Sequence, residues 1–160
     1  MRKVKVLVLL AITSMILSCE KQEIYSPYAQ LEEDVQKIDK YLDENNITAR
    51  QSQSGLRYVI QDEGLGDVPQ RGNTLKVHYT GTLLDGTKFD SSYDRGEALE
   101  YIHGVGKVIQ GWDEGMAYVG ERGKITLYVP SVLAYGRQGA GDLIGPNENL
   151  IFEVELLSVQ

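Results

Sequence analysis

The 160-residue sequence has few residues of several types, and each shortage excludes a class of protein. Its single cysteine, Cys19, rules out an intramolecular disulfide. The two histidines, His78 and His103, have no cysteine cluster or spaced carboxylates to support a metal site. Basic residues number 16 against 23 acidic ones, and the net charge of −7 disfavours nucleic acid as a partner. No acyl-transfer triad or phosphate-loop motif is present, and no cofactor is expected.

The one long apolar run lies at residues 6–17, directly after the basic residues of MRKVK. It has the length of a signal peptide and is too short to span a bilayer comfortably. Cys19 follows the run and the small residue Ser18, which resembles the lipobox of bacterial lipoproteins although Ile16 stands where Leu is commoner. We therefore expect residues 1–18 to be a signal peptide and Cys19 to be lipidated. Secretion with cleavage nearby is the alternative.

Charge and position then predict where the protein resides. Cleavage after residue 18 removes three basic residues and no acid, so the net charge falls from −7 to −10. The lipid, rather than electrostatic attraction, would hold such a chain at an anionic membrane. The expected location is the bacterial cell envelope, facing the periplasm. Glu20 rather than Asp after Cys19 favours the outer membrane over the inner one.

The segment after the leader contains a predicted amphipathic helix. Ser26 is a suitable N-cap, Pro27 suits the first helical turn, and Asn45 and Asn46 can end the helix. Its apolar residues recur at helical spacing: Leu31, Val35, Ile38 and Leu42. We favour a helix packed on its own domain over a dimerising helix or a spacer from the membrane. Residues 49–55 are polar and are interpreted as a linker.

From residue 56 onward the apolar period changes to two, which is typical of strands with one buried face. Such strands are predicted around residues 56–61, 75–80, 124–129 and 152–156, with a hairpin turn at Asp85-Gly86. Residues 108–119 have helical spacing and can cover one face of the sheet. The predicted fold class is therefore α+β, an antiparallel sheet curled around one short helix. Glycine-rich loops as long as residues 136–149 are usually functional or disordered, and apolar Leu143 and Ile144 indicate that part of this one leans over a neighbouring element.

Five blocks of sequence resemble one family. VHYTG, LDGTKFDSS, VIQGWDEGM, VPSVLAYG and LIFEVELL occur in the order and at the spacing of FKBP-type peptidyl-prolyl cis-trans isomerases. The resemblance runs from about residue 55 to residue 160 and implies a half-barrel of antiparallel strands around a helix, with an apolar pocket between them. The chain would then consist of a signal peptide (1–18), a lipidated segment with a short N-terminal helix and linker (19–54) and an isomerase domain (55–160).

The resemblance also implies which residues form the pocket. The catalytic set would be Tyr79, Phe89, Asp90, Ile109, Tyr135 and Phe152, and the substrate-binding set Leu99, Val108, Trp112, Ala134 and Ile144, with Trp112 as the floor. The Ile109 N–H and the Tyr135 hydroxyl would hydrogen-bond the peptide. Asp90 would be anchored by Arg95 and the Tyr79 hydroxyl. A simple surface acid is the alternative, and that description fits Asp94 better.

Three positions depart from the family pattern. Leu99 stands where many members have Phe, Lys107 where they have Glu, and Ala140 where the loop often has His. These departures bear on substrate preference and drug affinity more than on activity.

The expected function is isomerisation of X–Pro bonds in exported proteins, by a protein that is expected to be monomeric. Macrolide inhibitors of the family are possible ligands. The alternative is a non-catalytic chaperone that binds proline-containing segments, and turnover of a short X–Pro peptide separates the two functions.

Overall fold

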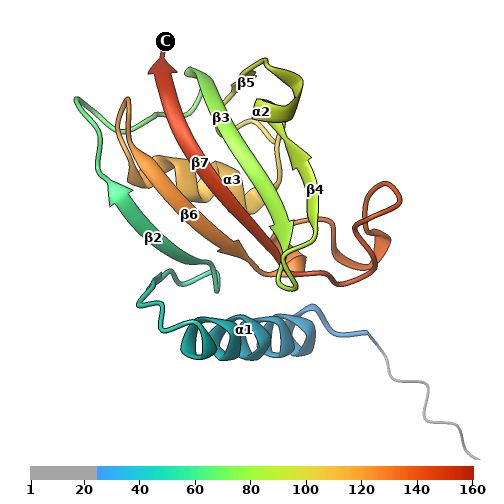
Figure 1. The fold of residues 1–160 in the computed structure, drawn as a ribbon. Helices are drawn as coiled ribbons and strands as arrows, with labels where there is room; N and C mark the ends of the chain where they lie inside the picture. Colours follow the sequence, from blue (N-terminus) through green and yellow to red (C-terminus); the bar gives the residue numbers. More distant parts are fainter. Residues whose placement is uncertain (1–24) are drawn as a thin grey trace, which may run out of the picture.

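The computed structural model describes residues 25–160 (Figure 1). The predicted signal peptide and the predicted lipidation site, Cys19, lie outside the described residues. Within residues 25–160 no helix combines the length and the apolar character needed to cross a membrane.

One antiparallel sheet of seven strands dominates residues 25–160 (Figure 1). The strands are β1 (Arg50–Gln51), β2 (Arg57–Asp62), β3 (Thr74–Leu83), β4 (Lys88–Ser91), β5 (Leu99–Ile102), β6 (Lys124–Val129) and β7 (Leu150–Val159). Their order is β1-β2-β6-β7-β3-β4, and β5 pairs with β3 beside β4. The alternation of apolar and polar residues turns one face of this sheet toward the core. The predicted α+β fold is therefore confirmed.

A short helix fills the inner face of the sheet. Helix α3 (Gln110–Gly115) continues into the 3₁₀ turn Met116–Tyr118, and it lies behind the strands in Figure 1. Trp112 and Met116 are buried against β3, β6 and β7. Gly111 allows the close approach, because a Cβ there would lie 2.5 Å from the Cγ1 atom of Val129. Residues 108–119 thus cover the sheet as the sequence predicts.

The N-terminal helix α1 (Pro27–Glu44) has the boundaries that its capping residues predict. The Ser26 hydroxyl accepts a hydrogen bond from the Ala29 N–H at 3.4 Å. At the other end Asn45 is the C-cap and Asn46 adopts a left-handed conformation with φ of 56°.

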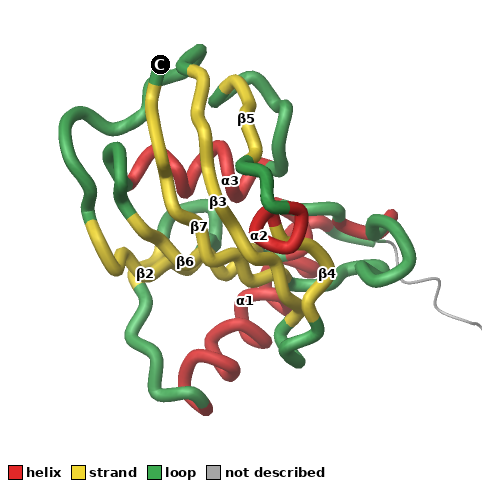
Figure 2. Tube along the Cα trace, turned by 45° about the horizontal axis from the view of Figure 1, so that its top comes forward, coloured by secondary structure: helices red, strands yellow, loops and turns green. Residues whose placement is uncertain are grey.

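Helix α1 packs across one end of the sheet (Figures 1 and 2). Ile38 and Leu42 are buried against Tyr128 of β6 and Ile151 of β7. Arg57 of β2 donates two hydrogen bonds to Asp39, at 2.8 and 3.0 Å. The favoured prediction, a helix packed on its own domain, is confirmed.

The buried face of α1 nevertheless differs from the predicted apolar stripe. It consists of Gln30, Asp34, Ile38 and Leu42, so two of its four positions are polar. Leu31 and Val35 are only half-buried, and both lie over Gly55. The helix is rotated by about one position, because Asp34 has polar partners on the domain, Ser131 and Asn149, and Gln30 donates to Asp34.

Two strands were not expected from the sequence. Strand β1 lies inside the predicted linker, where Arg50 pairs with Tyr58 of β2. Strand β5 pairs Leu99 with Val77 of β3. Each is very short and has no long alternating pattern. The predicted hairpin is present between β3 and β4, where the Leu83 N–H donates to the Thr87 carbonyl at 2.9 Å.

Candidate active site

A cavity of about 370 Å³ opens between the inner face of the sheet, α3 and the loop 136–149. Strands β3, β4 and β7 supply Tyr79, Phe89 and Phe152. Asp90 of β4 and Leu99 of β5 also line the cavity. The remaining lining residues come from the segments around α3 and from the chain between Tyr135 and Ile144: Lys107, Val108, Ile109, Trp112, Tyr135, Ala140, Gly141, Asp142, Leu143, Ile144. The cavity has the size and the concave, mainly apolar character of a small-ligand site.

Four aromatic rings form the floor and walls of the cavity. Trp112 is 97% buried, and its ring meets Tyr79 and Phe152 edge-on at centroid distances of 5.0 and 5.2 Å. Phe89 meets Phe152 edge-on at 5.5 Å. Such edge-to-face pairs hold each ring in one orientation. The cavity therefore has a rigid aromatic lining.

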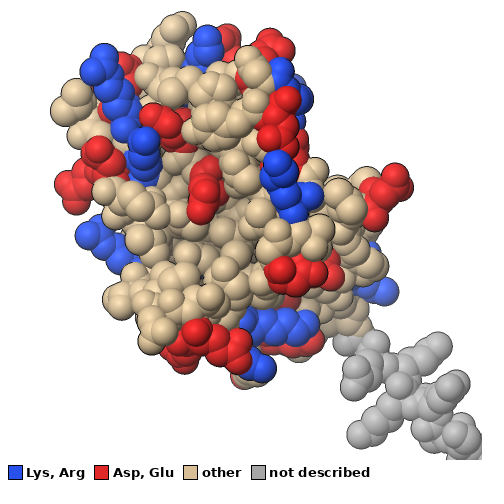
Figure 3. Space-filling model, viewed as in Figure 1, with Lys and Arg blue, Asp and Glu red and all other residues tan. Residues whose placement is uncertain are grey.

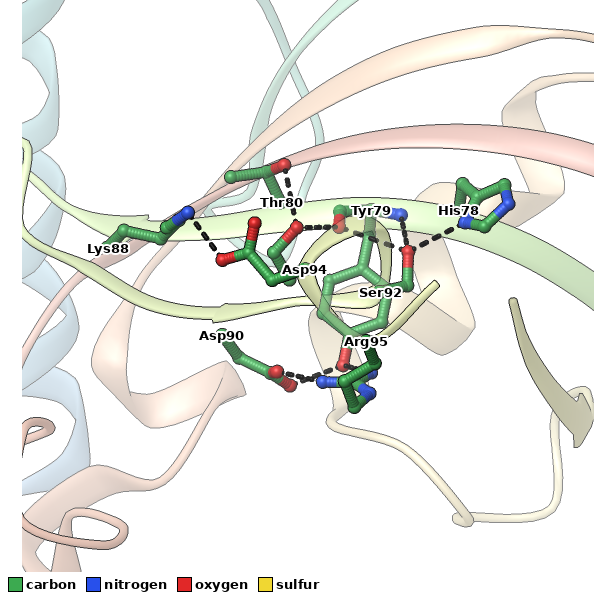
Figure 4. A network of polar contacts seen from close by, with 9 residues as sticks. His78, Tyr79, Thr80, Lys88, Asp90, Ser92, Asp94 and Arg95 are labelled. Carbon is green, nitrogen blue, oxygen red and sulfur yellow. Dashed lines mark hydrogen bonds and ion pairs between the residues drawn. The ribbon is translucent and has the colours of Figure 1, made fainter. Parts of the chain in front are cut away.

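The rim of the cavity carries a three-residue polar cluster (Figure 4). Asp90 accepts hydrogen bonds from the Tyr79 hydroxyl on one oxygen and from Arg95 Nη1 on the other. Arg95 Nη2 also donates to the Tyr79 hydroxyl at 3.0 Å. Asp94, by contrast, pairs with Lys88 on the surface. The structure thus brings together Asp90, Arg95 and Tyr79, as the sequence predicted.

Ser92 holds the backbone of Tyr79 through hydrogen bonds. This residue was not identified from the sequence. Its hydroxyl is fully buried in helix α2 (Ser92–Arg95), accepts from the Tyr79 N–H at 2.8 Å and donates to the Tyr79 carbonyl at 3.2 Å. The Nδ1 atom of His78 lies 2.9 Å from the same hydroxyl (Figure 4). Nothing in the sequence of Ser91 and Ser92, which follow Asp90, indicates that the Ser92 side chain is buried beneath Tyr79.

Burial and hydrogen bonding set the charges at the rim. Burial alone would raise the pKa of Asp90, but the hydrogen bonds from Tyr79 and Arg95 outweigh it, so the pKa is lowered from its usual value. Burial, with the nearby Asp90, raises the pKa of Tyr135, and it likewise raises that of Tyr79. Asp90 is therefore ionised at neutral pH while both tyrosines keep their protons.

The structure brings nearly all of the predicted site residues to this cavity. Arg95 lies outside the lining and reaches it through Asp90. Ala134 lies outside as well, in a neighbouring hollow beside Val132. Leu143, which the sequence predicted to lean over a neighbouring element, lies in the lining beside Ile144, whereas Gly141 and Asp142 were not identified from the sequence. In residues 25–160 no group of three or more His, Cys, Asp or Glu residues is arranged to hold a metal ion.

Comparison with known proteins identifies the fold and the activity. The family model described as FKBP-type peptidyl-prolyl cis-trans isomerase matches residues 66–157. The chain belongs to this family. The FK506-binding protein of Neisseria meningitidis is 52% identical over 103 residues, which is 63% of this chain and 94% of that protein. The crystal structure of FkpA from Escherichia coli superposes with a TM-score of 0.71 at 39% identity, over 83% of this chain and 64% of that chain.

Other FKBP-type isomerases are longer than this chain. FkpA of Aeromonas hydrophila is 43% identical over 130 residues, which is 80% of this chain but 47% of that protein. The shared region extends beyond the family match and includes more of the N-terminal part. Of the two functions that the sequence left open, family membership gives the isomerase. The boundaries at residues 18 and 54 stay predictions.

Proposed function

We propose that the cavity binds the X–Pro segment of exported polypeptides and accelerates rotation about that bond. The observation that carries the proposal is the aromatic-lined cavity with the Asp90–Arg95–Tyr79 cluster at its rim. The test is isomerisation of a short X–Pro peptide by the purified protein, followed by refolding of an exported protein whose slow phase is set by proline. If the protein accelerates isomerisation of the peptide but not refolding of the exported protein, it is an isomerase and the proposal that exported proteins are its substrates is contradicted.

The physical basis is the electronic structure of the amide bond. Resonance gives the planar amide charge-separated character, and rotation must overcome a barrier of ~18–20 kcal/mol. Water stabilises the planar form, whereas an aromatic cavity removes part of that stabilisation and accommodates the twisted form. Lowering the barrier by about 4 kcal/mol accelerates exchange roughly a thousandfold. No acid, base or metal is needed, because catalysis is preferential binding of the twisted amide.

Two hydrogen-bond donors at the cavity are available to the peptide. Within residues 25–160 the backbone N–H of Ile109 and the hydroxyl of Tyr135 donate to no acceptor. Ile109 lies immediately before α3, and the Tyr135 side chain is 40% exposed at the mouth of the cavity. In our proposal the Ile109 N–H binds a carbonyl of the substrate backbone, and the Tyr135 hydroxyl binds the carbonyl on the other side of the proline. Phe89 and Phe152 enclose the proline ring above Trp112.

Tyr135→Phe tests the hydroxyl while keeping the ring. We expect kcat/KM to fall about fivefold, because one neutral hydrogen bond contributes about 1 kcal/mol. If the bond forms mainly in the transition state, kcat falls and KM changes little. Tyr93→Phe is the matched control, since its hydroxyl bonds Glu155 at 3.3 Å outside the cavity. A parent-like rate for Tyr135→Phe would contradict this role.

We further propose that the protein is a lipoprotein anchored through Cys19 in the cell envelope, on the periplasmic side and preferably at the outer membrane. The arrangement of the apolar run, Ser18 and Cys19 supports this proposal. So does the charge of the domain, since acidic and basic side chains are interspersed over the face in Figure 3. Such a surface offers little attraction to an anionic bilayer, whereas two acyl chains suffice for stable attachment.

Cys19→Ser should release the protein from membranes into the soluble exported fraction. The thiol is the acceptor of the lipid, so the variant should also lose incorporation of labelled fatty acid. Cell fractionation after a high-salt wash measures the first effect. Ser18→Ala, which keeps a small residue before the cysteine, should stay with the membranes. Sedimentation of Cys19→Ser with membranes would rule out the anchor.

The cavity is also proposed to bind macrolide inhibitors of the family, and the Neisseria relative is named as a protein that binds FK506. Leu99, Lys107 and Ala140 all line the cavity, so the three departures from the family pattern lie where they alter its shape and charge. The client proteins and the monomeric state stay predictions.

A further inference from the structure

Helix α1 buries a carboxyl group that the proposed mechanism does not use. Asp34 lies in the middle of the helix and is 0% exposed. The ion pairs of the helix involve other acids: Glu33 with Lys37, Asp39 with Arg57 and Glu44 with Lys40. Within the described residues the partners of Asp34 are neutral. Burying a carboxyl group among neutral partners is more costly than burying an apolar side chain, so packing alone does not account for Asp34.

The partners of Asp34 lie at the two ends of one segment. Its Oδ2 atom accepts a hydrogen bond from the Ser131 hydroxyl at 2.6 Å. Its backbone carbonyl accepts from the Asn149 side-chain amide at 3.2 Å. The Asn149 Oδ1 atom accepts in turn from the Ser131 N–H at 3.0 Å. All three residues are at least 98% buried, so they form a closed cluster. Gln30 completes it by donating to Asp34 Oδ1 at 2.9 Å.

The segment between Ser131 and Asn149 carries one side of the cavity. It begins with the 3₁₀ turn Ser131–Leu133, two residues before Tyr135, and ends where β7 begins. Tyr135 and Ile144 both line the cavity from this segment. A hydrogen bond from the Asn147 N–H to the Gly136 carbonyl, at 2.8 Å, joins its two arms. The contacts with α1 therefore hold both ends of the segment that places these two side chains.

We propose that Asp34 is a positioning residue for the isomerase reaction. By binding Ser131 and Asn149 it fixes the ends of the 131–149 segment, and so sets the position of Tyr135 at the mouth of the cavity. Helix α1 lies outside the residues 66–157 that match the family model, so an element beyond that region takes part in shaping the site. The inference rests on the assignment of the cavity and of Tyr135 given under the proposed function.

The first test compares two acids of the same helix in the full chain. Asp34→Ala should lower kcat/KM about tenfold at a temperature where circular dichroism shows the parent fold, as expected when a hydrogen-bonded support is removed. Asp39→Ala, which breaks the ion pair with Arg57, loosens α1 from β2 and does not touch the 131–149 segment. It should leave kcat/KM within about twofold of the parent. Equal losses in the two variants would reduce Asp34 to a structural contact and overturn the proposal.

The second test asks whether Asp34 acts through Tyr135. If it does, Tyr135→Phe will cost much less in the Asp34→Ala background than in the parent, because the hydroxyl is already misplaced. Independent effects would multiply, and that result would also overturn the proposal. Asp34→Asn should restore activity, since its oxygen can accept from Gln30 while its amide donates to Ser131.

Two further results separate the causes of failure. If Asp34→Ala does not fold, Ser131→Ala is used instead, because it removes one hydroxyl from the same cluster. A kinetic loss there supports the proposal, and parent-like kinetics contradict it. If Tyr135→Phe has no effect in the parent while Asp34→Ala lowers kcat/KM, the assignment of Tyr135 fails. If Tyr135→Phe lowers activity but the Asp34 variants do not, only the present inference fails.

Discussion

Asp90→Ala is expected to lower kcat/KM for an X–Pro peptide by about 10- to 100-fold, because hydrogen bonds to a charged group contribute ~1.5–3 kcal/mol each. The carboxylate holds both the Tyr79 hydroxyl and Arg95. Its removal leaves the Tyr79 hydroxyl partly buried with one partner fewer and frees a ring that packs on Trp112 at 5.0 Å. Peptide kinetics, together with the free energy of unfolding from denaturant titration, measure the two effects separately.

Asp94→Ala provides the matched control for Asp90. Asp94 lies four residues further on, and its pair with Lys88 is half-exposed at both side chains. Surface pairs of this kind contribute ~0–1 kcal/mol, so kcat/KM should change less than about twofold. If both substitutions lower kcat/KM by the same small factor, Asp90 is an ordinary surface acid and its proposed role is wrong.

Gly81→Ala is expected to disrupt the aromatic wall from within the sheet. A Cβ at this position of β3 would lie 2.6 Å from the Phe89 ring and 3.0 Å from the Phe152 ring, so at least one ring must move. Overpacking of this kind costs ~1–3 kcal/mol of stability. A displacement of about 1 Å in the reacting geometry can cost up to ~100-fold in rate, and we expect a loss of at least tenfold in kcat/KM.

The control for Gly81 is Gly145→Ala. A Cβ at Gly145 would meet only Glu148, at an ordinary 3.7 Å, and the residue does not line the cavity. Its melting temperature and kcat/KM should stay close to those of the parent, since surface substitutions usually change stability by less than ~0.5 kcal/mol. A fully active and stable Gly81→Ala protein would show that the Phe89–Phe152 pair is not needed in its observed arrangement.

Features of the fold with local signals could be predicted from the sequence. The ends of α1 follow from Ser26, Pro27 and Asn45, which act on backbone groups within one turn of the helix. The β3–β4 turn follows from Asp85, whose carboxylate accepts from the Thr87 N–H at 2.8 Å. The long strands follow from their alternating residues, which separate a core face from a solvent face.

Features that depend on distant residues could not be predicted. Gln30 and Asp34 have the composition of an exposed helix face, yet both are buried. Asp34 accepts hydrogen bonds from residues 97 and 115 positions away, Ser131 and Asn149, and Gln30 donates to Asp34. Strand β1 is likewise a consequence of pairing with the edge strand β2, and its own two side chains have no strand pattern.

The candidate site could be predicted because all five sequence segments that resemble the family are present. The errors in the predicted lining concern single residues. Ala134 follows Leu133 in a tight turn and lies in the neighbouring hollow rather than in the cavity. Gly141 and Asp142 reach the lining through the bridge between Ala140 and Ile144, whose loop conformation has no sequence pattern of its own. The function of each lining residue remains a prediction for the experiments above.

The strand order has a consequence for when the domain can fold. Strand β7 follows all the other strands in the sequence, yet it lies in the middle of the sheet between β6 and β3. Without it the strands form two separate groups, β1-β2-β6 and β5-β3-β4, with no ladder joining them. Pairings between such distant segments form late and slowly. The sheet can therefore be completed only after residues 150–159 have been made, and until then the strands before β7 have no ladder that joins their two groups.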